Sequence, residues 1–319
     1  MISSPRPVDG SITQVDVMVQ TTVPNTDIMF VVDNSCSMGD DQQRLVDNFP
    51  SFARWFLGSG LDYHIGVVST DMDDPAQRGK LQQGFGRKWI EADDPNQINT
   101  FTQMAVLGVS GSPTEKGTDA AYAALEIERD GFNEGFYRDE AAIHTIVVAD
   151  EADYSGINER EFINWYDGLK RVADERTFSI IWDPASLGFG GRSYAPFNRQ
   201  IGGVYYQIRE TDWSSALDVL GLQATGMKTE YFLSRAPVED SIEVAVRLPI
   251  LDGGDFTPQS FPRAEFDDEG NAIDENGDPI TEPHYYYVPE RNSIRFLEYV
   301  PEEAYQIQIS YTVRSSSLL

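Results

Sequence analysis

Three oxygen-bearing side chains occupy alternate positions in one short segment of the sequence, Asp33-Asn34-Ser35-Cys36-Ser37. A carboxylate and two hydroxyls are hard oxygen donors, which Mg²⁺ and Ca²⁺ prefer to nitrogen or sulfur. Alternate residues of a tight loop can face one point, so these three side chains are candidate ligands of a divalent cation. A serine or aspartate after a strand also often caps the next helix, so the surrounding elements must decide between the two interpretations.

The segment follows an apolar run that predicts a buried parallel strand. Residues 27 to 33 contain five consecutive apolar residues and end on Asp33. Similar runs occur at residues 63–69, 144–149 and 177–182, with helical patterns between them. This alternation predicts a doubly wound α/β fold with a mostly parallel sheet. In such sheets ligands bind beyond the carboxyl ends of the strands, which is where Asp33 falls.

Helices are expected between these strands. The apolar positions from Leu45 to Phe56 recur at spacings of four, three and four residues, which predicts one apolar helix face. Pro50 lies inside this helix and lacks a backbone donor, so we expect a kink or a break near Asn48. Further helices are predicted at residues 114–129, 158–172 and 213–224.

The pattern Asp-x-Ser-x-Ser after an apolar first strand resembles the metal-ion-dependent adhesion site of von Willebrand factor A domains. The resemblance implies that a threonine from a later loop and an aspartate after the fourth strand complete the site. Asp150 ends the apolar run at residues 144–149 and matches that aspartate. Thr114 begins a Thr-x-x-Gly sequence at an expected helix start and matches the threonine, with Thr118 as the alternative. The implied metal ligands are Asp33, Ser35, Ser37, Thr114 and Asp150.

Other residues are expected at the rim of this site. Asp153 follows Asp150 in an acidic segment similar to one found in bacterial members of the family. Asp71 follows the second strand at the same edge of the sheet, where it could tune the site or belong to a solvated loop. The family's usual Thr-Asp-Gly after the fourth strand is Ala-Asp-Glu here, which changes the loop geometry that the family would use. Thr118 joins these two aspartates as a rim residue.

From about residue 237 the pattern changes to short strand-like segments, which predict a smaller β-sandwich or β-meander. Residues 12–20 alternate in the same way, and we expect them to join the C-terminal sheet. The expected organisation is an N-terminal strand segment at 1–23, an α/β domain at 24–235 and a β domain at 236–319. The α/β domain would then be an insertion into a discontinuous β domain.

Composition and charge exclude several classes of protein. Acidic residues number 52 and basic residues 24, which gives a formal net charge of −28 and argues against nucleic acid as a partner. No run approaches the length of a membrane span, and the N-terminal segment lacks the layout of a signal peptide. Cys36 is the only cysteine, so an internal disulfide is impossible and we expect a free, packed thiol.

Catalysis is not expected. A Mg²⁺-dependent phosphotransferase typically places a second acid two residues after the first, and Ser35 stands there. The sequence has no glycine-rich phosphate loop and no Gly-x-Ser-x-Gly sequence. His64, His144 and His284 fall in strand-like segments, where a structural role is the simpler interpretation. A metal-dependent hydrolase remains a weaker alternative.

The resemblance implies binding through a metal. Ser35, Ser37 and Thr114 would coordinate Mg²⁺, or Ca²⁺ or Mn²⁺, directly, while one or both aspartates act through water. A carboxylate from a protein or glycoprotein partner would complete the coordination of the cation. The alternative is a structural subunit of a surface assembly, such as a phage tail or another virion component, in which neighbouring subunits cover the site and the metal braces loops. Either function predicts an extracellular or surface-exposed protein, in the second case on a virion.

Overall fold

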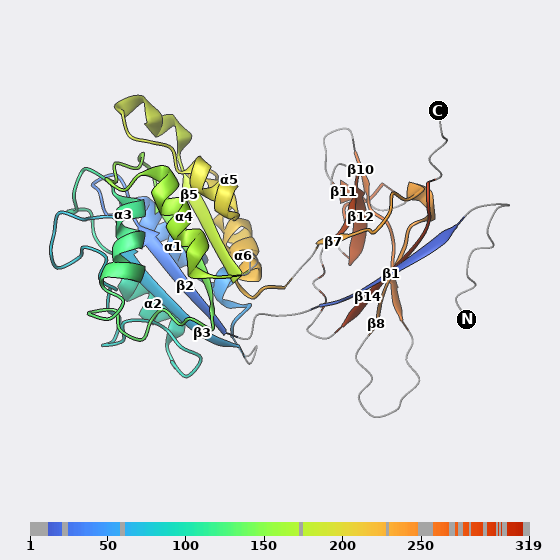
Figure 1. Ribbon diagram of the computed structural model, residues 1–319, viewed down its shortest axis with the longest axis horizontal. Helices are drawn as coiled ribbons and strands as arrows, with labels where there is room; N and C mark the ends of the chain where they lie inside the picture. The colour runs from blue at the N-terminus through green and yellow to red at the C-terminus, as the bar shows by residue number, and fades with distance from the viewer. Residues whose placement is uncertain are drawn as a thin grey trace. The chain divides into compact units, whose positions relative to one another are not determined.

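The chain forms two compact units, an α/β unit at Val23–Gly226 and a β unit made of Met1–Thr22 and Met227–Leu319 (Figure 1). The α/β unit therefore interrupts the chain of the β unit. The structure is a computed structural model. It describes residues 12–20, 25–57, 61–171, 175–227, 230–247, 258–267, 272–273, 277–280, 282–289, 292–297, 299, 301 and 305–314.

Five parallel strands form the sheet of the α/β unit, in the order β3-β2-β4-β5-β6. All eight residues of β4 are buried, as are seven of the eight residues in β2 and in β3, because helices cover both faces. The doubly wound fold predicted from the apolar runs is confirmed. The strands are β2 (Asn25–Val32), β3 (Asp62–Ser69), β4 (Ala142–Ala149), β5 (Arg176–Trp182) and β6 (Tyr205–Gln207).

Helices lie on both faces of the sheet (Figure 1), and an apolar layer joins them to each face. One layer holds α1 (Gly39–Ala53), α2 (Gln97–Ala105) and α6 (Trp213–Ala224) against the sheet. The other layer holds α3 (Gly117–Tyr122), the π-helical turn η1 (Ala123–Ile127), α4 (Glu159–Leu169) and α5 (Ala195–Ile201). A 3₁₀ helix, η3 (Pro184–Phe189), follows β5.

Helix α1 runs without a break through Pro50 to Ala53, so of the kink or break expected near Asn48, the break does not occur. Pro50 lies in the last turn, where its missing N–H leaves only one carbonyl without its intrahelical donor. The side-chain amide of Asn48 donates to the carbonyl of Arg44 at 2.9 Å and adds a further bond beside the proline. The apolar face of the helix also packs on β2, where the rings of Phe49 and Phe30 lie edge to face, 6.4 Å apart.

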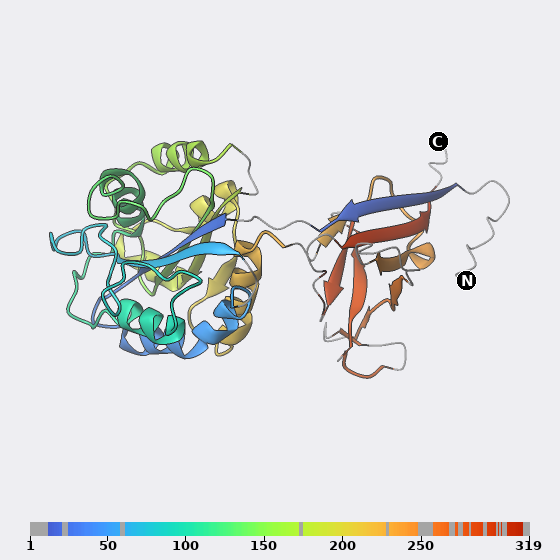
Figure 2. The ribbon, with the colours of Figure 1, turned by 90° about the horizontal axis from the view of Figure 1, so that it is seen from below.

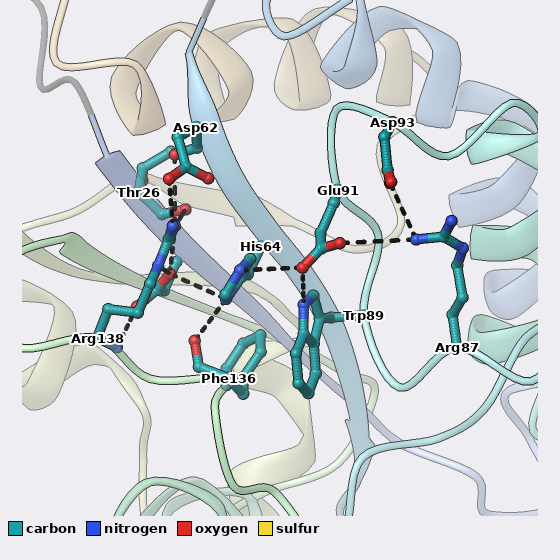
Figure 3. A network of polar contacts seen from close by, with 10 residues as sticks. Thr26, Asp62, His64, Arg87, Trp89, Glu91, Asp93, Phe136 and Arg138 are labelled. Atoms are coloured by element: carbon teal, nitrogen blue, oxygen red, sulfur yellow. Dashed lines mark hydrogen bonds and ion pairs between the residues drawn. The ribbon is translucent and has the colours of Figure 1, made fainter.

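A polar network secures the amino-terminal edge of the sheet (Figure 3). Asp27 of β2 is fully buried and accepts hydrogen bonds from the backbone N–H and Nε of Arg138, at 2.6 and 2.9 Å. Arg138 also pairs with Asp62 at the start of β3, at 2.8 Å. His64 of β3 lies 2.8 Å from the carbonyl of Phe136 and 3.3 Å from a carboxylate oxygen of Glu91. These contacts fix β2, β3 and the segment before β4 at the edge opposite to Asp33.

The described residues of the β unit form three antiparallel sheets, ordered β1-β14-β8-β9, β12-β13-β7 and β10-β11. Strand β1 (Thr13–Val19) pairs with β14 (Gln306–Thr312) along its whole length, and Figure 2 shows the two side by side in blue and dark red. The remaining strands are β7 (Glu230–Phe232), β8 (Glu243–Arg247), β9 (Gln259–Phe261), β10 (Glu265–Phe266), β11 (Ala272–Ile273), β12 (His284–Val288) and β13 (Ser293–Leu297). The short 3₁₀ helix η4 (Glu239–Ser241) precedes β8.

The three valine side chains of β1 point away from the core of the β unit, whereas Met18 packs against that core. Val15, Val17 and Val19 are 47%, 56% and 51% exposed. Asp16, on the other face, accepts hydrogen bonds from the hydroxyls of Ser234 and Tyr311 at 2.6 and 2.8 Å. The valine alternation therefore identifies the strand, although the opposite face, with Asp16 and Met18, is the one that contacts the rest of the β unit.

Candidate metal centre

The loop after β2 holds Asp33 rigidly at the carboxyl edge of the sheet. Its backbone N–H donates to the carbonyl of Val148 in β4 at 3.0 Å, and its carbonyl accepts from the side chain of Gln42 in α1 at 2.9 Å. Its Oδ1 atom accepts the backbone N–H of Ser35 at 2.7 Å. The side chain is fully buried, so its position is set by β2, β4 and α1 together.

Two serine hydroxyls continue from Asp33 toward the surface. Ser35, which is 2% exposed, lies 3.2 Å from Ser37, oxygen to oxygen. Ser37 is exposed and donates to Oδ1 of Asp150 at 3.2 Å. Asp150 directly follows β4 and is half-buried. The structure thus brings Asp33, Ser35, Ser37 and Asp150 together in one row of oxygen atoms that runs from the interior to the surface.

A residue that the sequence did not single out, Glu115, lies beside Asp33. Glu115 is fully buried, and Thr70 at the end of β3 donates its hydroxyl to Oε2 of this carboxylate. Burial and the charge of Asp33 raise the pKa of Glu115, while burial and the charge of Asp150 raise the pKa of Asp33. Glu115 directly follows Thr114, but no local pattern indicates which residue of this loop faces the interior.

The remaining predicted residues make contacts of other kinds. The backbone N–H of half-buried Thr114 donates to the hydroxyl of Ser112 at 3.2 Å. Thr118 is fully buried and donates to Oδ2 of Asp153 at 2.7 Å. Asp71 accepts backbone N–H groups of its own loop and that of Ser112, the last at 3.1 Å. Thr118, Asp153 and Asp71 are thus engaged in organising the loops around the row of oxygens.

Buried oxygen atoms at the site lack donors, which fits a cation. Oδ2 of Asp33 and Oε1 of Glu115 are buried and have no hydrogen-bond donor while both carboxylates are ionised. Such atoms are costly unless a shared proton or a metal satisfies them. Among the described residues, no three Asp, Glu, His or Cys side chains gather closely enough to hold a metal by themselves. A cation here therefore depends on the hydroxyls of Ser35 and Ser37 as well.

A cavity of about 360 Å³ opens beside Ser37 and Asp150. Arg209 contributes to its wall, where its Nε atom pairs with Asp183 at 2.6 Å. The side chain of Arg209 is 67% exposed, so this positive charge is accessible next to the acidic row. The other lining residues are Glu151, Tyr154, Ala185 and Ser186.

The histidines lie elsewhere in the structure. His64 belongs to the network at the opposite edge of the sheet, and His144 lies within β4 beside Thr177, at 2.9 Å. Burial lowers the pKa of His144 to about 3, so this imidazole is neutral. His284 belongs to the β unit. The oxygen site has no imidazole that could act as a general base.

Cys36 is a free thiol, as expected, but it is exposed rather than packed. The turn at residues 36–38 places the side chain of Met38 inward, where it is fully buried, and turns Cys36 and Ser37 outward. The turn geometry therefore decides which of these side chains is buried in the core.

No helix in the described part of the chain has the length and apolar character needed to cross a membrane.

These features define a doubly wound α/β module with an acidic, hydroxyl-lined site at the carboxyl edge of its sheet. No protein-family model matches the sequence, and no curated protein matches it. Solved structures similar to the chain include proximal thread matrix protein 1 from the mussel byssus, at 12% identity and a TM-score of 0.42 over 68% of this chain and 51% of that chain. A structure of the same mussel protein with a zinc-occupied MIDAS motif gives 11% identity and a TM-score of 0.39, over 68% of this chain and 51% of that chain.

A von Willebrand factor type A structure from Catenulispora acidiphila is also similar, at 11% identity and a TM-score of 0.37. The match covers 96% of this chain and 67% of that chain. The present chain thus spans about half the length of the mussel chains that it matches.

Proposed function

We propose that the α/β unit is a metal-dependent protein-binding module of the von Willebrand factor A type. The observation that carries the proposal is the row of oxygens from Asp33 through Ser35 and Ser37 to Asp150, with a buried carboxylate oxygen that lacks a donor at its inner end. Asp33, Ser35 and Ser37 would hold a divalent cation, Mg²⁺ or else Ca²⁺ or Mn²⁺. Asp150 would act directly or through water.

A bound cation would supply an electrophilic contact for an acidic partner. The row reaches the surface at the exposed Ser37, so a ligand oxygen from another molecule can approach from the cavity beside it. A carboxylate of a protein or glycoprotein would complete the cation's oxygen coordination. Arg209 in the cavity wall adds a second positive group for such a carboxylate, which helps to offset the acidic surface of this chain.

Binding fits the site better than catalysis does. The site offers carboxylates and hydroxyls but no imidazole, and the described histidines are used in other parts of the molecule. The loop that carries Asp33 is held by a backbone hydrogen bond to β4, and the loop after Asp150 is held by backbone hydrogen bonds to Arg192 and Glu115, which suits a preformed contact surface. We therefore propose a recognition role for this site, without a chemical step.

The replacement of Ser37 by alanine tests the metal site. Because Ser37 is exposed, the Ser37→Ala protein should fold like wild type. It should lose one of the hydroxyl oxygens that would coordinate the cation. In isothermal titration with Mg²⁺, Ca²⁺ and Mn²⁺ after dialysis against EDTA, wild type should bind one cation and the variant should bind at least about tenfold more weakly.

Asp47→Asn is the matched control because this exposed aspartate lies on α1, whose start follows the metal loop, and its side chain accepts a hydrogen bond from Gln43 in the same helix. The control should bind cations as wild type does. Equal affinity in wild type and Ser37→Ala would remove Ser37 from the site. No measurable binding by wild type would overturn the proposed function.

A further inference from the structure

The segment before α3 fixes Glu115 next to the metal site. The carbonyl of Glu115 accepts the backbone N–H of Tyr154 at 2.7 Å, which ties it to the loop after β4. The backbone N–H of Lys116 donates to the carbonyl of Thr70 at 3.3 Å, and the Thr70 hydroxyl donates to Oε2 of Glu115. Thr70 in turn donates its N–H to the carbonyl of Val32, the residue before Asp33. The Glu115 carboxylate is therefore positioned by the same strand ends that position Asp33.

No positive side chain compensates this pair of buried carboxylates. Within the described residues, neither Asp33 nor Glu115 forms a salt bridge with an arginine, lysine or histidine, and both are fully buried. The nearest basic residue in sequence, Lys116, pairs with Asp73 at 2.8 Å. Arg192 pairs with Asp153 at 2.7 Å. Two buried negative charges without a counter-charge are strongly unfavourable, so a divalent cation between them would remove the imbalance.

The free oxygens of the two residues point to the same conclusion. Thr70 occupies Oε2 of Glu115 and the Ser35 N–H occupies Oδ1 of Asp33. While both carboxylates are ionised, the second oxygen of each, Oε1 of Glu115 and Oδ2 of Asp33, is buried without a donor. Each carboxylate thus uses one oxygen for a protein hydrogen bond and leaves the other for a ligand.

We propose that Glu115 is a direct ligand of the cation, in the role that the sequence resemblance gives to Thr114. This inference rests on the proposed function, because it requires a cation at Asp33, Ser35 and Ser37. It changes the character of the site. Two carboxylates, Asp33 and Glu115, match the charge of one divalent cation, so the isolated protein retains the ion before any partner binds. A partner carboxylate then adds to a site that is already filled.

The test is the stability of Glu115→Gln with and without metal. Glutamine has nearly the same shape as glutamate and can accept the Thr70 hydrogen bond, but it carries no charge. In EDTA, Glu115→Gln should melt at a higher temperature than wild type, because the repulsion between the two carboxylates is gone. With millimolar Ca²⁺ or Mn²⁺ the order should reverse, because ligand binding stabilises wild type by mass action. The cation affinity of the variant in titration should be lower by about 100-fold or more.

Thr114→Ala is the second arm of the experiment and should keep the wild-type affinity for Ca²⁺ and Mn²⁺. If Glu115 has only a structural role, Glu115→Gln will shift the melting temperature equally in EDTA and in metal and will leave the affinity unchanged, which overturns the inference. In that case weaker binding by Ser37→Ala still supports the proposed function. If wild type binds no cation, the proposed function and the inference both fail.

Discussion

Replacing Asp153 by alanine is expected to destabilise the α/β unit by about 3–5 kcal/mol, because it removes a fully buried carboxylate that pairs with the half-buried Arg192. The Asp153 side chain is fully buried, and its Oδ2 atom accepts from Nε of Arg192 and from the hydroxyl of Thr118, both at 2.7 Å. Its Oδ1 atom accepts the hydroxyl of Ser155 at 2.5 Å. The substitution leaves all three donors without this acceptor.

Urea unfolding followed by tryptophan fluorescence measures this effect in the relevant unit, because all five tryptophans lie in the α/β unit. Asp150→Ala is the matched control in the same loop. Asp150 is half-buried and accepts a hydrogen bond from Ser37, so in EDTA its removal should change the free energy of unfolding by less than about 1 kcal/mol. Similar losses in the two variants would contradict the structural role assigned to Asp153.

The second large effect is a pH-dependent difference between wild type and Asp27→Asn. Burial raises the pKa of Asp27 to about 7, although the charges of Arg138 and Lys170 and the hydrogen bonds from Arg138 lower it. The ordinary value for the unfolded chain is 3.8. Between these values the folded protein binds a proton that the unfolded chain releases, so stability from this group is present below pH 3.8 and is lost as the pH rises through 7.

Asp27→Asn should therefore be about as stable as wild type near pH 4 and more stable above pH 7. The difference follows from roughly three pKa units and amounts to at most about 4 kcal/mol. Urea unfolding at several pH values between 4 and 8 measures it. Asp62→Asn is the control, since this carboxylate pairs with the same Arg138 but has a 64% exposed side chain. A wild type that is more stable than Asp27→Asn at pH 8 would show that the pairing with Arg138 outweighs burial.

The α/β fold could be predicted because its strands are buried on both faces. The apolar runs that end at Asp33 and Asp150 correspond to β2 and β4, each of which is almost wholly buried. A parallel sheet also brings the carboxyl ends of its strands to one edge, which explains why Asp33 and Asp150 meet although they are far apart in sequence. Hydrophobic periodicity and topology together account for this part of the site.

The loop before α3 could not be predicted in the same way. Thr114, Glu115 and Thr118 all bear oxygen atoms, and local sequence does not fix which of them faces Asp33. Contacts with distant segments decide this, above all the hydrogen bonds that join Glu115 to Thr70 and Tyr154. The feature that identifies Glu115 is that it is a buried carboxylate without a salt bridge to a basic side chain among the described residues. This feature depends on the burial of Glu115, which the sequence alone does not give.

The orientation of β1 also depends on tertiary contacts. The alternation of Val15, Val17 and Val19 predicts a strand but suggests that the valines face the core. In the structure Asp16 faces Ser234 and Tyr311, and the valines are exposed. Hydrophobic alternation alone would therefore predict the opposite orientation of β1, with the valines facing the core and Asp16 facing outward.

The proposed function requires a divalent cation at Asp33, Ser35 and Ser37. Crystals of the full chain grown with Mn²⁺, with diffraction data that record its anomalous scattering, show directly whether the ion is bound there. We expect an anomalous peak within coordination distance of the oxygens of these three residues. The absence of a peak there at saturating Mn²⁺, or a peak only at the acidic loop that follows β3, would contradict the proposed function.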